Sequence, residues 1–418
     1  MRITTLLRRL LGVSQTVVRN VRFEGDDKLV VDVVPTWRKP RCGLCGKRRP
    51  HYDTLSKPRH WRDIAIGSVL VWLAYRCRRV DCPTCGVRVE QVPWAAHDSR
   101  FTLSLEELAA FLARVTDRTT VSRMLGVTWR AVGSMIKRVV GDVLDPNRLD
   151  GLKRIAIDEF SYRKRHRYIT VIVNHDTGDV IWANEGRSAE TLHKFFDELG
   201  PERVAALETV TIDMSASYKA ALAERAPHVE VIFDRFHVQK LAHDALDEIR
   251  REIWRTLRGA SDEDAAAAAK AVKGSRFSLH RRRRNQTNRD FARLSDIQRT
   301  HKPLFRAYLL KETLADALDI QDADEADDEL HGWLSWASRS RLKPFVRVAR
   351  TIRRHRDGIR AYLRERLTNG LAEGINNKLR TVARRAFGFH SAEALIAMLF
   401  LCCSTIPLDP PVPRYWTH

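Results

Sequence analysis

The stretch RIAIDEFSYRKRHRYITVIVNHDTGDVIWANEGRS, residues 154–188, decides the fold of the centre of the chain. It contains three apolar runs, 155–157, 168–173 and 180–183, which are separated by a basic turn and by a turn that contains Gly178. Apolar runs of this length with Asp- and Gly-containing turns between them are typical of antiparallel strands. The sequence therefore predicts a three-stranded meander whose first strand ends on the carboxylate of Asp158.

Two later apolar runs also end on an aspartate. The run through residues 210–212 ends on Asp213, and the run 229–233 ends on Asp234. Carboxylates that are brought together repel one another unless a cation neutralises them. Hard oxygen ligands without cysteine or histidine nearby favour Mg²⁺ or Mn²⁺. The alternative for each aspartate alone is a cap on the helix or turn that follows it.

The segment TNGLAEGINNKLR, residues 368–380, supplies a third candidate acid. Residues 369–370 are a turn signal before a predicted helix, which carries Glu373 in its first turns. Amide and guanidinium side chains follow on this helix: Asn376, Asn377, Arg380 and Arg384. A carboxylate beside such groups suits a metal ligand next to a phosphate backbone. The alternative is a surface glutamate favoured by the helix dipole.

Two Cys-x-x-Cys pairs, each followed by glycine, lie near the N-terminus: Cys42, Cys45, Cys82 and Cys85. Four thiolates suit the tetrahedral coordination of Zn²⁺, and because they leave no open position the zinc would be structural. A disulfide or redox pair is the alternative, disfavoured because cytosolic thiols stay reduced. Cys77 is a fifth candidate ligand, and His51 and His60 are weaker ones. Residues 46–81 are expected to hold one further strand pair.

Residues 119–138 have the pattern of a helix-turn-helix motif. A first helix is predicted to end at Leu125 and a second to begin near Thr128, behind an earlier helix that starts with a capping box at 104–107. In this motif the start of the second helix faces bases and later residues face phosphates. The nominated residues are Thr128, Trp129, Arg130 and Ser134 for bases, and Lys137 and Arg138 for phosphates. A plain two-helix packing unit is the alternative.

The charge of the chain favours a polyanionic partner. Its 418 residues include 73 Lys and Arg against 52 Asp and Glu, a formal net charge of +21. Such an excess predicts binding to DNA or RNA, although an Arg-rich proteome would give the same balance. The arginines of 333–367 suggest a DNA-tracking surface, and the basic cluster 280–284 is either a DNA contact or a solvated loop. Because no membrane span or secretory signal is recognised, a cytoplasmic, nucleoid-associated protein is expected.

The order of these features resembles the DDE transposases of the ISL-three insertion-sequence family, over about residues 41–401. The most specific parts are DRFH at 234–237 and the block that begins at 369 with NGLAEGINN. The resemblance implies an RNase H-like core in which the first and fourth strands are neighbours, with Asp158, Asp213 and Glu373 holding catalytic Mg²⁺ (or Mn²⁺). It also implies a helical insertion before the glutamate helix. Possible supporting residues of this site are Asp234, His237, Asn376 and Asn377.

The expected fold is therefore a multidomain α+β chain. It comprises an N-terminal zinc-binding β module with four cysteine ligands (1–95), a helix-turn-helix domain (96–150), an RNase H-like α/β catalytic core with a mixed sheet (151–251 and 341–405), a helical insertion (252–340) and a C-terminal tail (406–418).

By the resemblance, the function is that of a transposase. It would bind the terminal inverted repeats of its element as a homodimer on double-stranded DNA, cleave phosphodiester bonds and join the freed 3′-OH to target DNA. The rivals are a DNA-binding regulator with an inactive catalytic core and a structure-specific nuclease without strand transfer. The presence of all three acids counts against the first rival.

Overall fold

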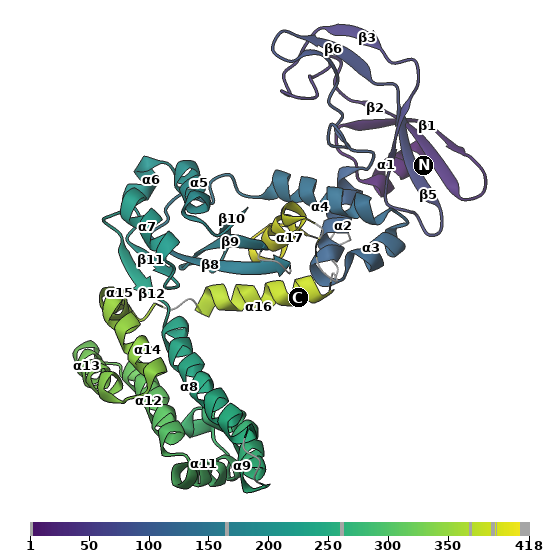
Figure 1. The fold of residues 1–418 in the computed structure, drawn as a ribbon. Helices are drawn as coiled ribbons and strands as arrows, with labels where there is room; N and C mark the ends of the chain where they lie inside the picture. The colour runs from purple at the N-terminus through teal and green to yellow at the C-terminus, as the bar shows by residue number, and fades with distance from the viewer. Residues whose placement is uncertain are drawn as a thin grey trace. The chain divides into compact units, whose positions relative to one another are not determined.

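The computed structural model describes residues 3–163, 167–259, 263–367, 370–385, 389 and 391–409. The chain divides into two compact units, Met1–Arg148 with Leu379–His418, and Leu149–Lys378. Each unit combines helices and strands (Figure 1), which confirms the predicted α+β class.

The N-terminal part of the first unit consists of two small sheets and helix α1 (Ile3–Leu11), which packs against the first strand. The four-stranded sheet has the order β1 (Thr16–Phe23), β2 (Lys28–Pro35), β5 (Leu70–Tyr75), β4 (Arg59–Arg62). The three-stranded sheet has the order β3 (His51–Thr54), β6 (Arg78–Cys82), β7 (Gly86–Val89). Four strands therefore begin within residues 46–81, where one pair of strands was predicted. The difference arises because β4 and β5 extend the sheet of β1 and β2, whereas β3 and β6 pair with each other.

The predicted helix-turn-helix is confirmed. Its helices are α2 (Leu103–Val115), α3 (Arg118–Leu125) and α4 (Trp129–Val143). Gly126 ends α3 in the left-handed region at φ 62°, and the Thr128 hydroxyl caps α4 by accepting from the Ala131 N–H at 3.2 Å. The prediction that α2 starts with a cap at Ser104 was wrong. Thr102 caps it instead, because its backbone is extended and its hydroxyl accepts from the Leu105 N–H.

Helix α17 (Ala392–Cys403) packs against α2 and α4, although it lies far from them in the sequence. Most of its side chains are buried, including Cys402 and Cys403. This helix completes the hydrophobic packing of the helix-turn-helix part of the first unit.

The second unit is built on a five-stranded mixed sheet with the order β10-β9-β8-β11-β12 (Figure 1). The strands are β8 (Arg154–Arg163), β9 (Arg167–Asn174), β10 (Val180–Glu185), β11 (Thr209–Ile212) and β12 (Glu230–Phe233). The first three form the predicted antiparallel meander, and β11 is parallel to both β8 and β12. Asp158 was predicted at the end of its strand but lies in the middle of β8, because β9 continues to pair with β8 as far as Arg163.

Helices follow and flank these strands. They are α5 (Ala189–Leu199), α6 (Pro201–Ala205), α7 (Ala216–Arg225), α8 (Arg235–Arg258), α9 (Glu263–Gly274), α10 (Arg276–His280), the 3₁₀ helix η1 (Arg283–Asn285), α11 (Asn288–Thr300), α12 (Lys302–Asp319), α13 (Ala323–Arg339), α14 (Lys343–Arg354) and α15 (Arg356–Glu365). Helix α16 (Gly370–Arg385) begins in the second unit and ends in the first.

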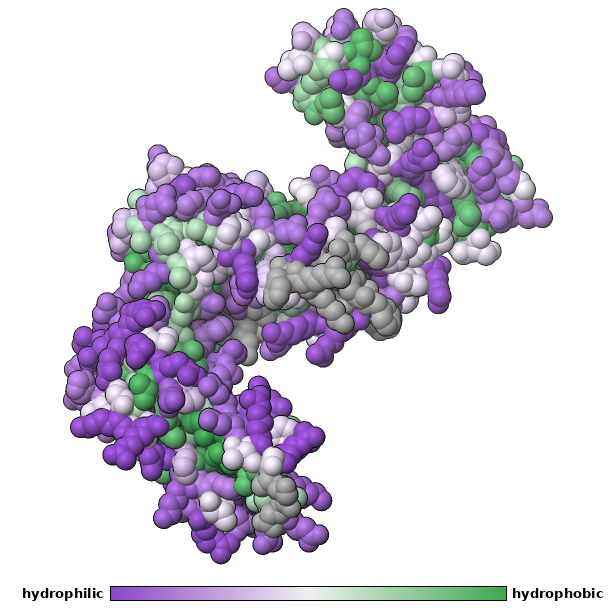
Figure 2. All heavy atoms as spheres, in the orientation of Figure 1, coloured by the Kyte–Doolittle hydropathy of each residue, from purple (hydrophilic) through white to green (hydrophobic). Residues whose placement is uncertain are grey.

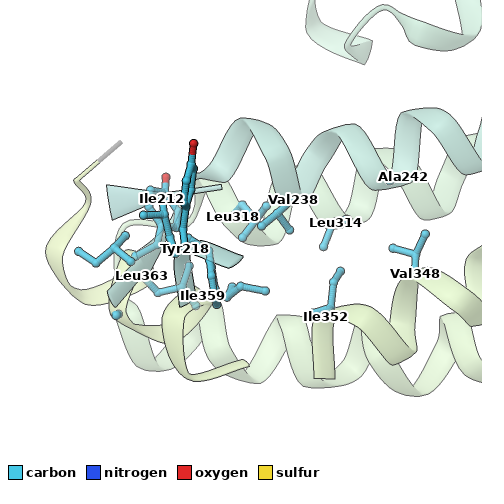
Figure 3. Close-up of a cluster of buried hydrophobic side chains, with 14 of the residues drawn as sticks. Ile212, Tyr218, Val238, Ala242, Leu314, Leu318, Val348, Ile352, Ile359 and Leu363 are labelled. Atoms are coloured by element: carbon cyan, nitrogen blue, oxygen red, sulfur yellow. The ribbon is translucent and has the colours of Figure 1, made fainter. Parts of the chain in front are cut away.

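One hydrophobic core joins the sheet to the helices of the second unit. Figure 3 shows side chains from β11, α7, α8, α12, α14 and α15 packed together, among them Ile212, Tyr218, Val238, Leu318, Ile352 and Ile359. Because α8 contributes to this core next to β11, the start of α8 is held beside the ends of the central strands.

The face drawn in Figure 2 is covered mainly by hydrophilic side chains. Among the helices in the described ranges, none combines the length and the apolar character that a membrane crossing requires.

Candidate functional site

Three aspartates meet at the centre of the mixed sheet. Strand β11 pairs in parallel with β8, with Thr211 opposite Ala156, so Asp213 and Asp158 each lie two residues beyond a matched pair. Side chains alternate between the faces of a strand, so two residues beyond a matched pair both carboxylates lie on one face, and neighbouring strands are ~4.8 Å apart. On the other side of β11, Ile212 lies opposite Phe233, which puts Asp234 beside Asp213.

Burial dominates the chemistry of Asp158. It raises the pKa of this carboxyl to about 6, and the negative charges of Asp213 and Asp234 act in the same direction. The N–H of Glu159, which donates to Asp158 Oδ1 at 2.7 Å, and the nearby His237 act against this rise. A divalent cation bound beside a half-buried carboxylate and its acidic neighbours would stabilise their ionised forms.

The two other aspartates are oriented by the backbone. Asp213 accepts from the Ser215 N–H at 2.9 Å in the turn that leads into α7. Asp234 is buried and stands at the cap position of α8, where its N–H donates to the Ile212 carbonyl at 3.0 Å. Its carboxylate Oδ2 lies 2.9 Å from His237 Nδ1.

His237 belongs to the same electrostatic cluster. The hydrogen bond with Asp234 raises the pKa of this imidazole, against the effect of burial, and the charges of Asp213 and Asp158 add to the rise. The aspartates and this histidine therefore act on one another, which sequence spacing alone did not establish. Arg235, between them in the chain, pairs with Asp319 of α12 and ties the start of α8 to the helices.

The glutamate segment forms a helix as predicted. Glu373 and Asn376 lie in α16, but their side chains are outside the described residues. Asn377, Arg380 and Arg384 are exposed on this helix. Near the end of α16, Arg385 donates to the carbonyls of Ala113 and Arg114 at 3.2 Å, a contact that the sequence did not suggest.

The four predicted zinc ligands converge. The sulfur atoms of Cys42, Cys45, Cys82 and Cys85 all lie within 4.8 Å of one another. Cys45 Sγ and Cys82 Sγ are 3.7 Å apart. A tetrahedron with Zn–S bonds of ~2.3 Å has S–S edges of ~3.8 Å, so the thiols fit a zinc ion.

Cys77 is separate from this cluster. It is buried in the core of the four-stranded sheet with Trp61 and Trp94, and burial raises the pKa of its thiol to about 12. Its place in this core, apart from the four clustered sulfur atoms, separates Cys77 from the candidate zinc ligands. The structure adds a neighbour that the sequence did not reveal: His97 packs so closely over Gly43, inside the first cysteine pair, that a Cβ at this position would clash with its ring.

The helix-turn-helix residues differ in accessibility. Thr128, Arg130 and Ser134 are exposed near the start of α4. Trp129 is half-buried under the guanidinium of Arg118, whose Cζ lies 3.6 Å from the ring centroid. This stacking leaves room only for glycine at 133, because a Cβ there would meet the same guanidinium.

Two residues predicted to contact phosphates bind carboxylates of the protein itself. Arg138 binds the buried carboxylate of Glu106 through Nε and Nη2, at 2.6–3.1 Å. Lys137 pairs with Glu393 of α17 at 2.5 Å. Lys137 and Arg138 thus bind carboxylates of α17 and α2 in this structure, and their contact with phosphates stays a prediction.

Some arginines of residues 333–367 and of the basic cluster 280–284 are paired with carboxylates. The pairs are Arg281 with Asp290, Arg282 with Asp316 and Asp319, Arg347 with Glu248, Arg356 with Asp327, and Arg364 with Glu230. These guanidinium groups connect helices of the second unit to one another and to β12. The DNA-tracking role of the other arginines in this region, among them Arg339, Arg350 and Arg354, stays a prediction.

A helix-turn-helix unit joined to a sheet with clustered aspartates defines a DNA-binding transposase of the DDE class, and comparisons with known proteins agree. Residues 155–399 match a family described as a transposase, of the ISL3 DDE type, and residues 90–140 match the helix-turn-helix domain of transposase family ISL3. The chain is 38% identical over 425 residues to the transposase for insertion sequence element IS1557 of Mycobacterium tuberculosis, covering 96% of each protein. It is 30% identical over 395 residues to the transposase for IS1001 of Bordetella parapertussis, covering 93% of this chain and 95% of that protein. The chain belongs to the ISL3 family of insertion-sequence transposases.

Proposed function

We propose that this transposase binds the terminal inverted repeats of its element, cleaves the DNA at the ends and transfers the 3′-OH ends to target DNA. The observation that carries the proposal is the register of β8 and β11, which sets Asp158 and Asp213 side by side. The sheet order, with the first strand between the second and the fourth, supports an RNase H-like core.

Asp158, Asp213 and Glu373 are the proposed ligands of Mg²⁺ (or Mn²⁺). Their carboxylate oxygens are the donors that these ions prefer. Burial, together with the charges of Asp213 and Asp234, raises the pKa of Asp158, so a bound cation would favour its ionised form. When bound, two such ions activate the attacking oxygen and stabilise the leaving oxygen of an in-line displacement. Asp234 holds His237 toward the aspartates, so the pair supports the site by positioning and charge. Asn376 and Asn377 share the glutamate helix and are proposed to assist in the same way.

DNA recognition is proposed for the first unit. Exposed Thr128, Arg130 and Ser134 would read bases, with Trp129 beside them, and Arg380 and Arg384 would contact phosphates. The four thiolates would hold a structural Zn²⁺ that keeps the β module folded. Pairing of two element ends requires at least a homodimer on DNA, and access to chromosomal DNA requires the cytoplasm at the nucleoid.

The proposed domain organisation keeps the zinc module at 1–95 and the RNase H-like core at 151–251 with the glutamate helix. Residues 252–340 form the helical insertion, which shares its hydrophobic core with the sheet. The packing of α17 on α2 and α4 assigns this helix to the helix-turn-helix part, rather than to the core segment 341–405.

Substitutions that replace each proposed carboxylate by its neutral amide test the catalytic proposal. Asp158→Asn, Asp213→Asn and Glu373→Gln should each reduce cleavage and strand transfer to background, because metal binding is lost, while binding to a terminal-repeat duplex stays within about twofold of wild type. Asp244→Asn, at an exposed carboxylate of α8, is the matched control and should leave all activities unchanged. If any one of the three variants kept near-normal Mg²⁺-dependent cleavage, the residue changed in that variant would not be a required metal ligand.

A pre-cleaved repeat end separates the transposase from its rivals. Joining of the 3′-OH end to a target plasmid is the expected outcome. Nicking of plasmids that lack the repeats, without joining, would instead favour a structure-specific nuclease. Binding without any chemistry would favour a regulator with an inactive core.

A further inference from the structure

A pocket of about 610 Å³ lies where the four-stranded sheet meets the segment that leads into α2. Its lining residues are Arg59, His60, Trp72, Arg100 and Phe101. The first two come from the edge strand β4, Trp72 comes from β5, and the last two directly precede the cap of α2. The volume lies within the roughly 300–1,000 Å³ that is usual for small-ligand sites.

The walls of this pocket are held by backbone pairing. Strand β4 pairs with β5, with Arg62 opposite Trp72. On its other side Arg62 forms a parallel bridge with Phe101, and its N–H donates to the Arg100 carbonyl at 2.9 Å. The hydroxyl of Thr102 donates to the buried carboxylate of Asp63 at 2.6 Å, which fixes the segment against the sheet. The pocket is therefore preformed.

The chemistry of the lining is cationic and aromatic. It combines two guanidinium groups and an imidazole with an indole and a phenyl ring, and the lining set contains no carboxylate. Within the described part of the chain, no ion pair joins Arg59 or Arg100 to an acidic side chain. The Arg59 guanidinium donates to the Ser99 carbonyl at 3.5 Å and its Cζ lies 5.2 Å from the centroid of the Trp61 ring. The ammonium of Lys28, which pairs with Glu24 at 2.6 Å, lies 5.8 Å from the centroid of the Trp72 ring.

These groups match the two parts of a nucleotide. Guanidinium groups bind phosphate oxygens through paired N–H donors, and an aromatic face stacks on any base. A phosphate of an intact duplex would use the arginines alone, because its bases are already stacked on their neighbours. We propose that this pocket binds one unpaired nucleotide of DNA, with its base on Trp72 and its phosphate on Arg59 and Arg100. The inference uses the DNA-binding part of the proposed function and does not depend on the metal chemistry.

The test measures how tightly the full-length protein binds an oligothymidylate of about 12 nucleotides, a length within the site sizes of single-strand binding folds. Trp72→Leu and Arg100→Ala should each weaken this binding by about tenfold or more, in proportion to a lost stacking or phosphate contact. Arg88→Ala removes an exposed charge from β7, outside the pocket, and should change the affinity by less than about threefold. Equal losses for Arg88→Ala and Arg100→Ala, or an unchanged affinity for Trp72→Leu, would overturn the proposal.

A second measurement uses the unmodified protein, so it stands even if Trp72→Leu fails to fold. An oligonucleotide carrying 5-iodo-deoxyuridine is photo-crosslinked to the wild type and the adducts are mapped to peptides. Adducts at Trp72 or Phe101 are expected, and adducts confined to other segments would contradict the pocket. Asp158→Asn should give the same adducts, so failure of the catalytic proposal and failure of this one give different results.

Discussion

At the scale of single residues, the burial of the Asp158 carboxylate lowers the stability of the folded protein at neutral pH. Its pKa is raised from 3.8 to about 6 in the folded, metal-free protein. Below pH 3.8 both the folded and the unfolded chain are protonated here, and no penalty exists. As the pH rises to about 6 the unfolded chain loses its proton first, so the free energy of unfolding falls, by up to ~3 kcal/mol at neutral pH.

Asp158→Asn should therefore stabilise the metal-free protein at pH 7 by roughly 1–3 kcal/mol, because the buried charge is removed. The same variant should lose the stabilisation that Mg²⁺ gives the wild type. Thermal unfolding in magnesium-free buffer, with and without added Mg²⁺, measures both effects. Asp244→Asn should behave like the wild type. If Mg²⁺ still stabilised the protein carrying Asp158→Asn, this carboxylate would not be a ligand.

The sequence supplied the three candidate aspartates because each follows a short apolar run, a pattern that is visible without a structure. It did not reveal that Asp234 and His237 act on Asp158, because that depends on how β12 pairs with β11. It also did not reveal that Arg138 binds the buried carboxylate of Glu106, which lies in another helix. Local patterns identify charged groups but not the partners that neutralise them.

At the scale of elements, the close packing of α15 against β12 fixes the position of the strand that precedes Asp234. Gly358 of α15 faces this strand so closely that a Cβ would lie 2.9 Å from the Val231 carbonyl oxygen and would clash with the Phe233 ring. Phe233 directly precedes Asp234, so a shift of this strand would displace the buried carboxylate.

Gly358→Ala should reduce the free energy of unfolding by about 1–3 kcal/mol through overpacking. Gly332→Ala is the matched control: it lies in α13 with no atom within 4 Å of its Cβ position, and should be neutral or stabilise by roughly 0.5–1 kcal/mol. Urea unfolding of the purified variants compares the two. Equal stabilities would mean that α15 can move away from the strand at little cost.

The elements themselves were largely predictable. The meander, the helix-turn-helix and the helix that contains Glu373 follow from hydrophobic periodicity and turn residues. The four strands in residues 46–81 were not foreseen, because β4 and β5 join strands that are distant in sequence. The continuation of β8 beyond Asp158 was missed for a similar reason, since pairing with β9 extends it.

At the scale of the whole molecule, the zinc module should fold only with its metal. Cys42→Ser should lower the zinc content of the full-length protein from about one atom per chain towards none, and weaken binding to the repeat duplex. Cys77→Ala should retain the zinc, because this thiol belongs to a separate core. Elemental analysis measures the zinc content of both variants. Loss of zinc from the protein carrying Cys77→Ala would mean that Cys77 is a zinc ligand.

The central claim is that two aspartates and a late glutamate hold the same divalent ions. When hydrogen peroxide and ascorbate are added, Fe²⁺ bound in place of Mg²⁺ reduces the peroxide to hydroxyl radicals that cut the backbone close to the metal. The cuts can be mapped along the full-length chain. The account predicts cuts near residues 158, 213 and 373 that excess Mg²⁺ suppresses and that Asp213→Asn removes together. Cuts near 158 and 213 with none near 373, or cuts that survive Asp213→Asn, would contradict it.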